Sequence, residues 1–128
     1  MKIDVEWYDD AKTIILQRFH DGWTVDDYYT TFARSAELLK EDHGALRGIF
    51  TDCTQDGLPP RNMMGGYKKA LTYGKLPFVM VNPHSVSRML FESIRKAYKV
   101  ERAIYYAKSL DEAEELLDQH YAQLSAPS

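Results

Sequence analysis

Apolar and polar residues alternate at the start of the chain and predict two short strands. Between residues 3 and 8, isoleucine, valine and tryptophan alternate with polar or amphipathic neighbours, which is the two-residue period of a half-buried strand. Residues 13–19 form a second, denser apolar run, and the Asp-Asp-Ala-Lys segment before it is typical of a tight turn. The chain therefore opens with a predicted β-hairpin.

Helical and strand patterns alternate through the rest of the chain. Apolar residues at three- and four-residue steps predict four helices, separated by three short apolar runs that predict strands. The predicted helix starts are Thr24, Asn62, the Asn82-Pro83 pair with Ser85 as an alternative cap, and Ser109. The predicted strands begin at Leu46, Pro77 and Arg102, while His43-Gly44 ends the first helix and Tyr73-Gly74 the second.

This order of elements predicts an α/β fold with a five-stranded mixed sheet. The opening hairpin adds one antiparallel edge strand, and each later strand follows a helix, which implies parallel pairing through right-handed crossovers. We expect residues 1–125 to form one domain and residues 126–128 to form a frayed tail.

Composition and charge indicate the class of protein and its compartment, but not its chemistry. The chain has 128 residues, 45% of them hydrophobic and 27% charged, which are ordinary values for a globular domain. A formal net charge of −3 gives no overall attraction to nucleic acid or to anionic lipid. The single cysteine excludes an internal disulfide, and no segment has the length of a signal peptide or a membrane span. We therefore expect a cytoplasmic protein with no membrane span and no nucleic-acid partner.

The segment from Leu46 to Gly57 is the most informative stretch. Its apolar half predicts a central strand, and its polar half predicts a loop at the carboxyl edge of the sheet, where open α/β folds place their sites. The residues that we expect at a ligand or partner surface on this edge are Trp23, Asp52, Cys53, Thr54, Asp56, Arg61, Met64, Tyr67 and His84.

Three segments of the chain resemble the STAS/SpoIIAA-like family, whose fold is shared in outline with Sec14-type lipid-binding domains. They are the strand-to-helix junction 19–24, the strand end 50–54 and the Ser-Leu-Asp-Glu-Ala-Glu-Glu-Leu-Leu segment 109–117. The resemblance implies a sequential strand order with the helices mainly on one face of the sheet. It also implies a regulatory role of the bacterial type. The phosphorylatable serine of anti-sigma-factor antagonists is missing, and Thr54 is the nearest hydroxyl.

Catalytic and metal-binding interpretations of the carboxyl edge lack specific motifs. Cys53 with His84 could form a nucleophile and base, and two histidines with cysteine and aspartate could bind zinc. The sequence has no CxxC, HxxxH or HExxH spacing to support either. The alternative is that Asp52 caps nearby backbone, Cys53 packs as a small apolar group and His20 and His84 are surface residues. We predict no catalytic residue, no metal and no cofactor.

Basic and aromatic residues suggest two further surfaces. A basic group could hold a phosphate or an acidic partner, or could form solvated helix faces. It consists of Arg61, Lys68, Lys69 and Lys75, followed by several cations between residues 88 and 102. Trp7 and one of Tyr105 or Tyr106 are expected on the less covered sheet face. An apolar patch there predicts a homo-oligomer.

We therefore predict a non-enzymatic STAS-like regulatory or protein-interaction module whose partner surface is the 52–61 loop and the helix after it. The alternative is a Sec14-like carrier or sensor that binds a small apolar or anionic ligand near Trp23, Met63, Met64 and Tyr67. A thiol or hydrolytic enzyme built on Cys53 is the third hypothesis. An enclosed apolar cavity would favour the carrier, an exposed patch the interaction module, and an exposed, acidified Cys53 the enzyme.

Overall fold

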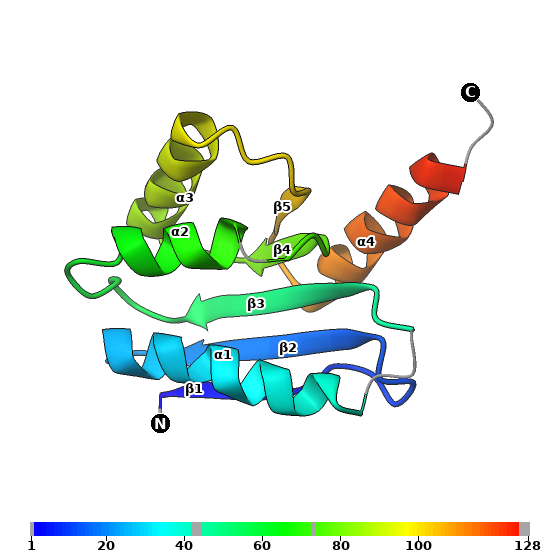
Figure 1. Ribbon diagram of the computed structural model, residues 1–128, viewed down its shortest axis with the longest axis horizontal. Coiled ribbons are helices and arrows are strands. Elements are labelled where there is room, and N and C mark those ends of the chain that lie inside the picture. Colours follow the sequence, from blue (N-terminus) through cyan, green and yellow to red (C-terminus); the bar gives the residue numbers. More distant parts are fainter. Residues whose placement is uncertain (1, 42–44, 73, 126–128) are drawn as a thin grey trace.

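The computed structural model describes residues 2–41, 45–72 and 74–125 of the chain and contains five strands and four helices (Figure 1). In chain order these elements are β1 (Ile3–Trp7), β2 (Ile14–His20), α1 (Val25–Leu39), β3 (Gly48–Gln55), α2 (Met64–Thr72), β4 (Phe78–Val81), α3 (Ser85–Ala97), β5 (Ile104–Ala107) and α4 (Leu110–Ser125). The predicted tail 126–128 and the predicted helix stops at His43-Gly44 and Tyr73 fall outside the described residues.

The five strands form one sheet in the order β1-β2-β3-β4-β5. β1 pairs antiparallel with β2, while β2, β3, β4 and β5 pair in parallel. The predicted mixed α/β fold is therefore confirmed. β3 lies at the centre, and its apolar side chains are buried on both faces because helices cover both sides of this strand.

The helices divide unequally between the two faces of the sheet. One hydrophobic cluster joins strand residues such as Phe19, Phe78 and Met80 to side chains of α1, α2 and α3. A second cluster on the opposite face joins Phe50 and Val79 to α4. Figure 1 shows α1 crossing in front of β1 and β2, with α2 and α3 grouped beyond β3. Three of the four helices thus share one face, as expected.

Local hydrogen bonds explain where the helices begin. Thr24 and Asp27 form the predicted capping box: the Asp27 backbone N–H donates to Thr24 Oγ1 at 3.1 Å, and the Thr24 N–H donates to Asp27 Oδ2 at 3.0 Å. Ser109 caps α4 by accepting from the Glu112 N–H at 3.1 Å. The cap of α3 is His84, whose Nδ1 accepts from the Val86 N–H at 3.1 Å, so the Ser85 alternative was wrong.

Trp7 does not lie where the sequence pattern suggested. It alternates in phase with Ile3, which belongs to the cluster under α1, and its indole N–H donates to Glu41 at 3.3 Å. On the opposite face, beyond the strands that α4 covers, Arg18 of β2 forms ion pairs with Glu6 of β1 and Asp52 of β3, each at 3.5 Å. The prediction that Trp7 belongs to an apolar patch on this face is wrong, because the strand register places the Trp7 side chain on the face that α1 covers.

Two predicted strands start later than expected. β3 begins at Gly48 rather than Leu46, and β5 begins at Ile104 rather than Arg102. The Arg102 guanidinium instead donates to the backbone oxygens of Ala70 and Leu76, at 2.7 and 2.5 Å, which joins the end of α2 to the segment before β5. In the described part of the chain, no helix combines the length and the apolar character needed to cross a membrane.

Candidate functional site

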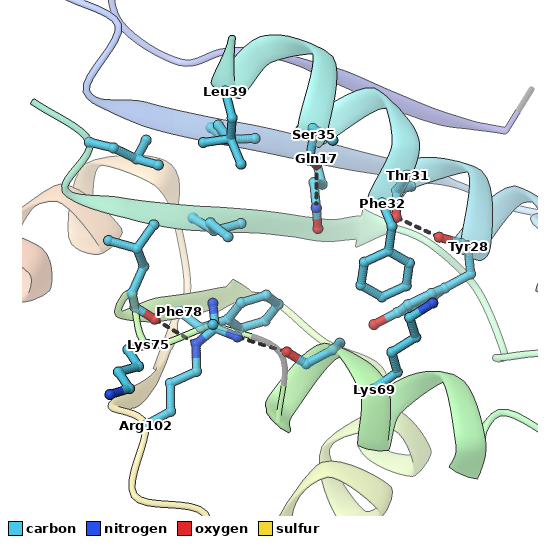
Figure 2. Close-up of a pocket in the computed structure, with 17 residues that line it drawn as sticks. Gln17, Tyr28, Thr31, Phe32, Ser35, Leu39, Lys69, Lys75, Phe78 and Arg102 are labelled. Carbon is cyan, nitrogen blue, oxygen red and sulfur yellow. Dashed lines mark hydrogen bonds between the residues drawn. The ribbon is translucent and has the colours of Figure 1, made fainter. Parts of the chain in front are cut away.

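A pocket of about 260 Å³ lies between α1 and α2, above the sheet. Its floor is formed by Ile15, Ile49 and Phe78, which stand at the amino ends of the parallel strands. The wall from α1 includes Phe32 and Leu39 (Figure 2). The pocket therefore opens at the end of the sheet opposite to the carboxyl edge.

The arrangement of α1 and α2 creates this pocket. The two helices meet near their amino ends, where the rings of Tyr28 and Tyr67 lie 5.5 Å apart between centroids. Gly66 of α2 faces this junction, because a Cβ there would lie 3.8 Å from the Tyr29 hydroxyl of α1 and 3.1 Å from the Met63 methyl group. Further along α1, Ser35 and Ala36 are too small to close the space to α2. The result is a crevice that widens toward the carboxyl ends of both helices.

Polar side chains around the pocket bind partners within the protein. Gln17 donates from Nε2 to Ser35 Oγ at 3.3 Å and accepts at Oε1 from Thr51 Oγ1, also at 3.3 Å. Thr31 is buried and donates to the Tyr28 carbonyl at 2.5 Å. Because these partners are internal, the surface that the pocket offers to a ligand is mainly hydrocarbon.

Three cations line the same pocket. Figure 2 shows Lys69, Lys75 and Arg102 on the side formed by α2 and the neighbouring segments, opposite Ser35 and Leu39 of α1. The Lys69 ammonium lies 5.0 Å from the centroid of the Phe32 ring. Arg102 lies over Phe78, 5.3 Å from the ring centroid. Among the described residues that line the pocket, none is an aspartate or a glutamate.

The predicted residues on the carboxyl edge of β3 are brought together, but they satisfy each other's hydrogen bonds. Asp52 Oδ1 accepts from the Thr54 backbone N–H at 3.1 Å and from Thr54 Oγ1 at 2.7 Å. Asn82 Nδ2 donates to Thr54 Oγ1 at 3.1 Å and to the Lys108 carbonyl at 2.8 Å. These bonds tie the ends of β3 and β4 to the start of α4, which is a structural role.

Cys53, Asp56, Tyr67 and Trp23 form a buried cluster beneath the 56–63 loop. The cluster encloses a cavity of about 10 Å³, and the Trp23 Nε1–H has no hydrogen-bond partner there. Burial, followed by the nearby Asp56 carboxyl, raises the pKa of the Cys53 thiol well above its usual value. Burial also raises the pKa of Asp56 to about 6. Tyr67 donates to or accepts from Ser87 Oγ at 3.2 Å.

Of the remaining predicted residues, His84 lies near the Asp56 carboxyl, while Arg61 and Met64 lie on a separate surface. Arg61 and Met64 line an open groove between the 58–65 segment and α3. His84 holds the start of α3 through Nδ1, as described above. Of the nine predicted site residues, none lines the pocket between α1 and α2.

Sequence reasoning missed the pocket because its lining comes from many separate segments and contains no motif. Two signals pointed toward it. Ser35 and Ala36 occur on the inward side of α1, where larger apolar residues would fill the interior. Lys75 and Arg102 precede strands at the amino edge of the sheet, and Lys69 lies near the end of the helix before β4.

Comparison of the chain with models of known protein families gives no match, and comparison with curated protein sequences gives none either. The class of the protein is therefore described by its fold alone. It is an α/β protein with a five-stranded mixed sheet and a crevice between its first two helices. Within residues 2–41, 45–72 and 74–125, no three His, Cys, Asp or Glu side chains are grouped so as to hold a metal ion.

Proposed function

We propose that this protein is a non-enzymatic binding protein, a carrier or sensor, that holds a small apolar molecule in the pocket between α1 and α2. The observation that carries this proposal is the pocket itself, which has a hydrocarbon floor and internally satisfied polar groups. Ligand sites are typically concave and mainly apolar, with a few polar groups that set orientation. The STAS-like resemblance is compatible with this function and remains a prediction from the sequence.

The buried state of Cys53 supports a binding role over a thiol enzyme. A catalytic thiol needs access to substrate and a lowered pKa. Cys53 is 4% exposed and its pKa is raised. His84 Nδ1 is occupied as a helix cap, so this nitrogen is not available as a base.

Filling the pocket tests the proposal directly. Ala36 is exposed and lines the pocket, so Ala36→Phe should occupy the ligand space without disturbing the core. The probe is N-phenylnaphthylamine, a neutral dye that fluoresces in apolar surroundings. We expect the wild type to bind the dye and Ala36→Phe to bind it at least about tenfold more weakly, because the added ring removes apolar contact area.

The matched control is Ala33→Phe, on the same helix but outside the pocket. This variant should bind the dye as the wild type does. Absence of dye binding by the wild type, or equal loss in both variants, would contradict the proposal.

A second candidate function is protein interaction through the open groove beside α3. Leu58 and Met64 line this groove and are 67% and 45% exposed, and such exposed apolar groups are typical of contact surfaces. Homo-oligomerisation thus remains a prediction, now supported by this surface rather than by Trp7. Sedimentation velocity tests it, and a monomer at high micromolar concentration would contradict it.

A further inference from the structure

We propose that the ligand of the α1–α2 pocket is an anionic amphiphile, a molecule with a short hydrocarbon chain and a carboxylate or similar acidic head. This inference rests on the proposed function and adds the chemical class of the ligand. It is carried by the juxtaposition of a hydrocarbon floor with Lys69, Lys75 and Arg102 in one pocket whose lining, within residues 2–41, 45–72 and 74–125, includes no acidic side chain.

The charge balance around the pocket is positive. Three formal positive charges line it. The carboxyl ends of α1 and α2 point to the same region and contribute roughly half a negative charge each. Arg102 donates to the backbone oxygens of Ala70, near the end of α2, and Leu76, before β4. Its charge therefore offsets the partial negative charge at the carboxyl end of α2. A net excess of about two positive charges therefore remains, and it is concentrated on the two lysines.

Both lysines are placed to receive an acidic head. In the described part of the chain, neither Lys69 nor Lys75 forms an ion pair with an acidic side chain. Lys69 is exposed, but its ammonium lies over the ring of Phe32 at the pocket wall. Lys75 is also exposed and lies in the segment between α2 and β4, on the same side of the pocket as Arg102 (Figure 2). The head group would lie at the mouth of the crevice, with the chain on Ile15, Ile49 and Phe78.

The size of the pocket limits the length of the chain. A volume of about 260 Å³ is that of roughly nine water molecules at liquid density. This space suits a chain of about eight to ten carbons rather than a two-chain lipid.

Three ten-carbon probes with different head groups separate the effect of charge from the effect of the hydrocarbon chain, which has nine carbons in decanoate and ten in the other two. Decanoate, decanol and decyltrimethylammonium compete with N-phenylnaphthylamine for the wild-type protein, each kept below its micelle concentration. We expect decanoate to bind about tenfold more tightly than decanol, because its carboxylate would pair with the lysine ammonium groups. Decyltrimethylammonium should bind more weakly than decanol, because its charge has the same sign as theirs.

Variants that remove positive charge test whether Lys69 and Lys75 cause the preference for decanoate over decanol. The double variant Lys69→Gln with Lys75→Gln should lose about tenfold in decanoate affinity and leave decanol affinity unchanged. Lys96→Gln, an exposed cation on α3 outside the pocket, is the matched control and should change neither. Unchanged decanol binding also shows that the double variant is folded.

The outcomes distinguish this inference from the proposed function. Three results would contradict an anionic ligand without contradicting the apolar pocket. They are equal affinity for decanoate and decanol, tighter binding of decyltrimethylammonium than of decanol, and an unchanged preference for decanoate in the double lysine variant. Failure of the dye to bind the wild type would overturn both.

Discussion

Asp56 has a carboxyl group whose pKa the fold raises toward neutrality. It is 5% exposed and lies near Cys53, His84 and Asp52, and burial raises its pKa to about 6. An unfolded aspartate has a pKa of about 3.9, so the native state binds its proton more tightly than the unfolded state does. The contribution of this group to stability is therefore greatest below about pH 4 and is lost as the pH rises through about 6.

This shift predicts that Asp56→Asn stabilises the protein at neutral pH. The amide removes the cost of a buried carboxylate, so the free energy of unfolding should rise by about 1–2 kcal/mol at pH 7. At pH 4 the gain should vanish, because the wild-type carboxyl is then protonated in the native state. Urea unfolding at both pH values measures the difference, and a gain that is independent of pH would contradict the explanation.

Cys53 should behave as a core residue rather than as a reagent. Its thiol is 4% exposed, and its Sγ lies 3.8 Å from the Thr51 carbonyl. We expect an aromatic disulfide reagent to modify the native protein at least about a hundredfold more slowly than the unfolded chain, since reaction requires opening of the core. Absorbance of the released thiolate follows the reaction. Rapid modification of the native protein would revive the thiol-enzyme hypothesis.

At the scale of elements, the start of α1 is determined by local chemistry. The Thr24–Asp27 capping box satisfies two backbone N–H groups that the helix cannot pair internally. Thr24→Ala should therefore lower the free energy of unfolding by about 1 kcal/mol. Thr30→Ala, at an exposed position within the same helix, is the control and should change stability by less than about 0.5 kcal/mol. Equal losses in urea unfolding would contradict the capping role.

The elements themselves could be predicted because their signals are local. Alternation and capping residues lie within a few positions of one another, so the order of strands and helices followed from the sequence. The errors have two causes. His84 caps α3 in place of the neighbouring Ser85, because an imidazole nitrogen can also accept a backbone N–H. Arg102 binds the backbone around α2 instead of joining β5, and these partners are distant in the chain.

At the scale of the whole molecule, the pocket depends on how α1 and α2 diverge. That angle is set by contacts between segments far apart in the chain, such as the packing of Tyr28 on Tyr67. The rule that places sites at the carboxyl edge directed attention to Asp52 and Thr54, which instead bind one another and Asn82. The small residues Ser35 and Ala36 were visible in the sequence, but their meaning depends on the helix that faces them.

The central claim is that the ligand site lies between α1 and α2, at the amino edge of the sheet. Titration of the isotope-labelled protein with decanoate, followed through backbone amide chemical shifts, tests this claim most directly. We predict that the largest shifts occur at Ile15, Ser35, Ala36 and Ile49, with little change from Asp52 to Arg61. Shifts concentrated in the 52–61 segment, or no shifts at all, would contradict the account.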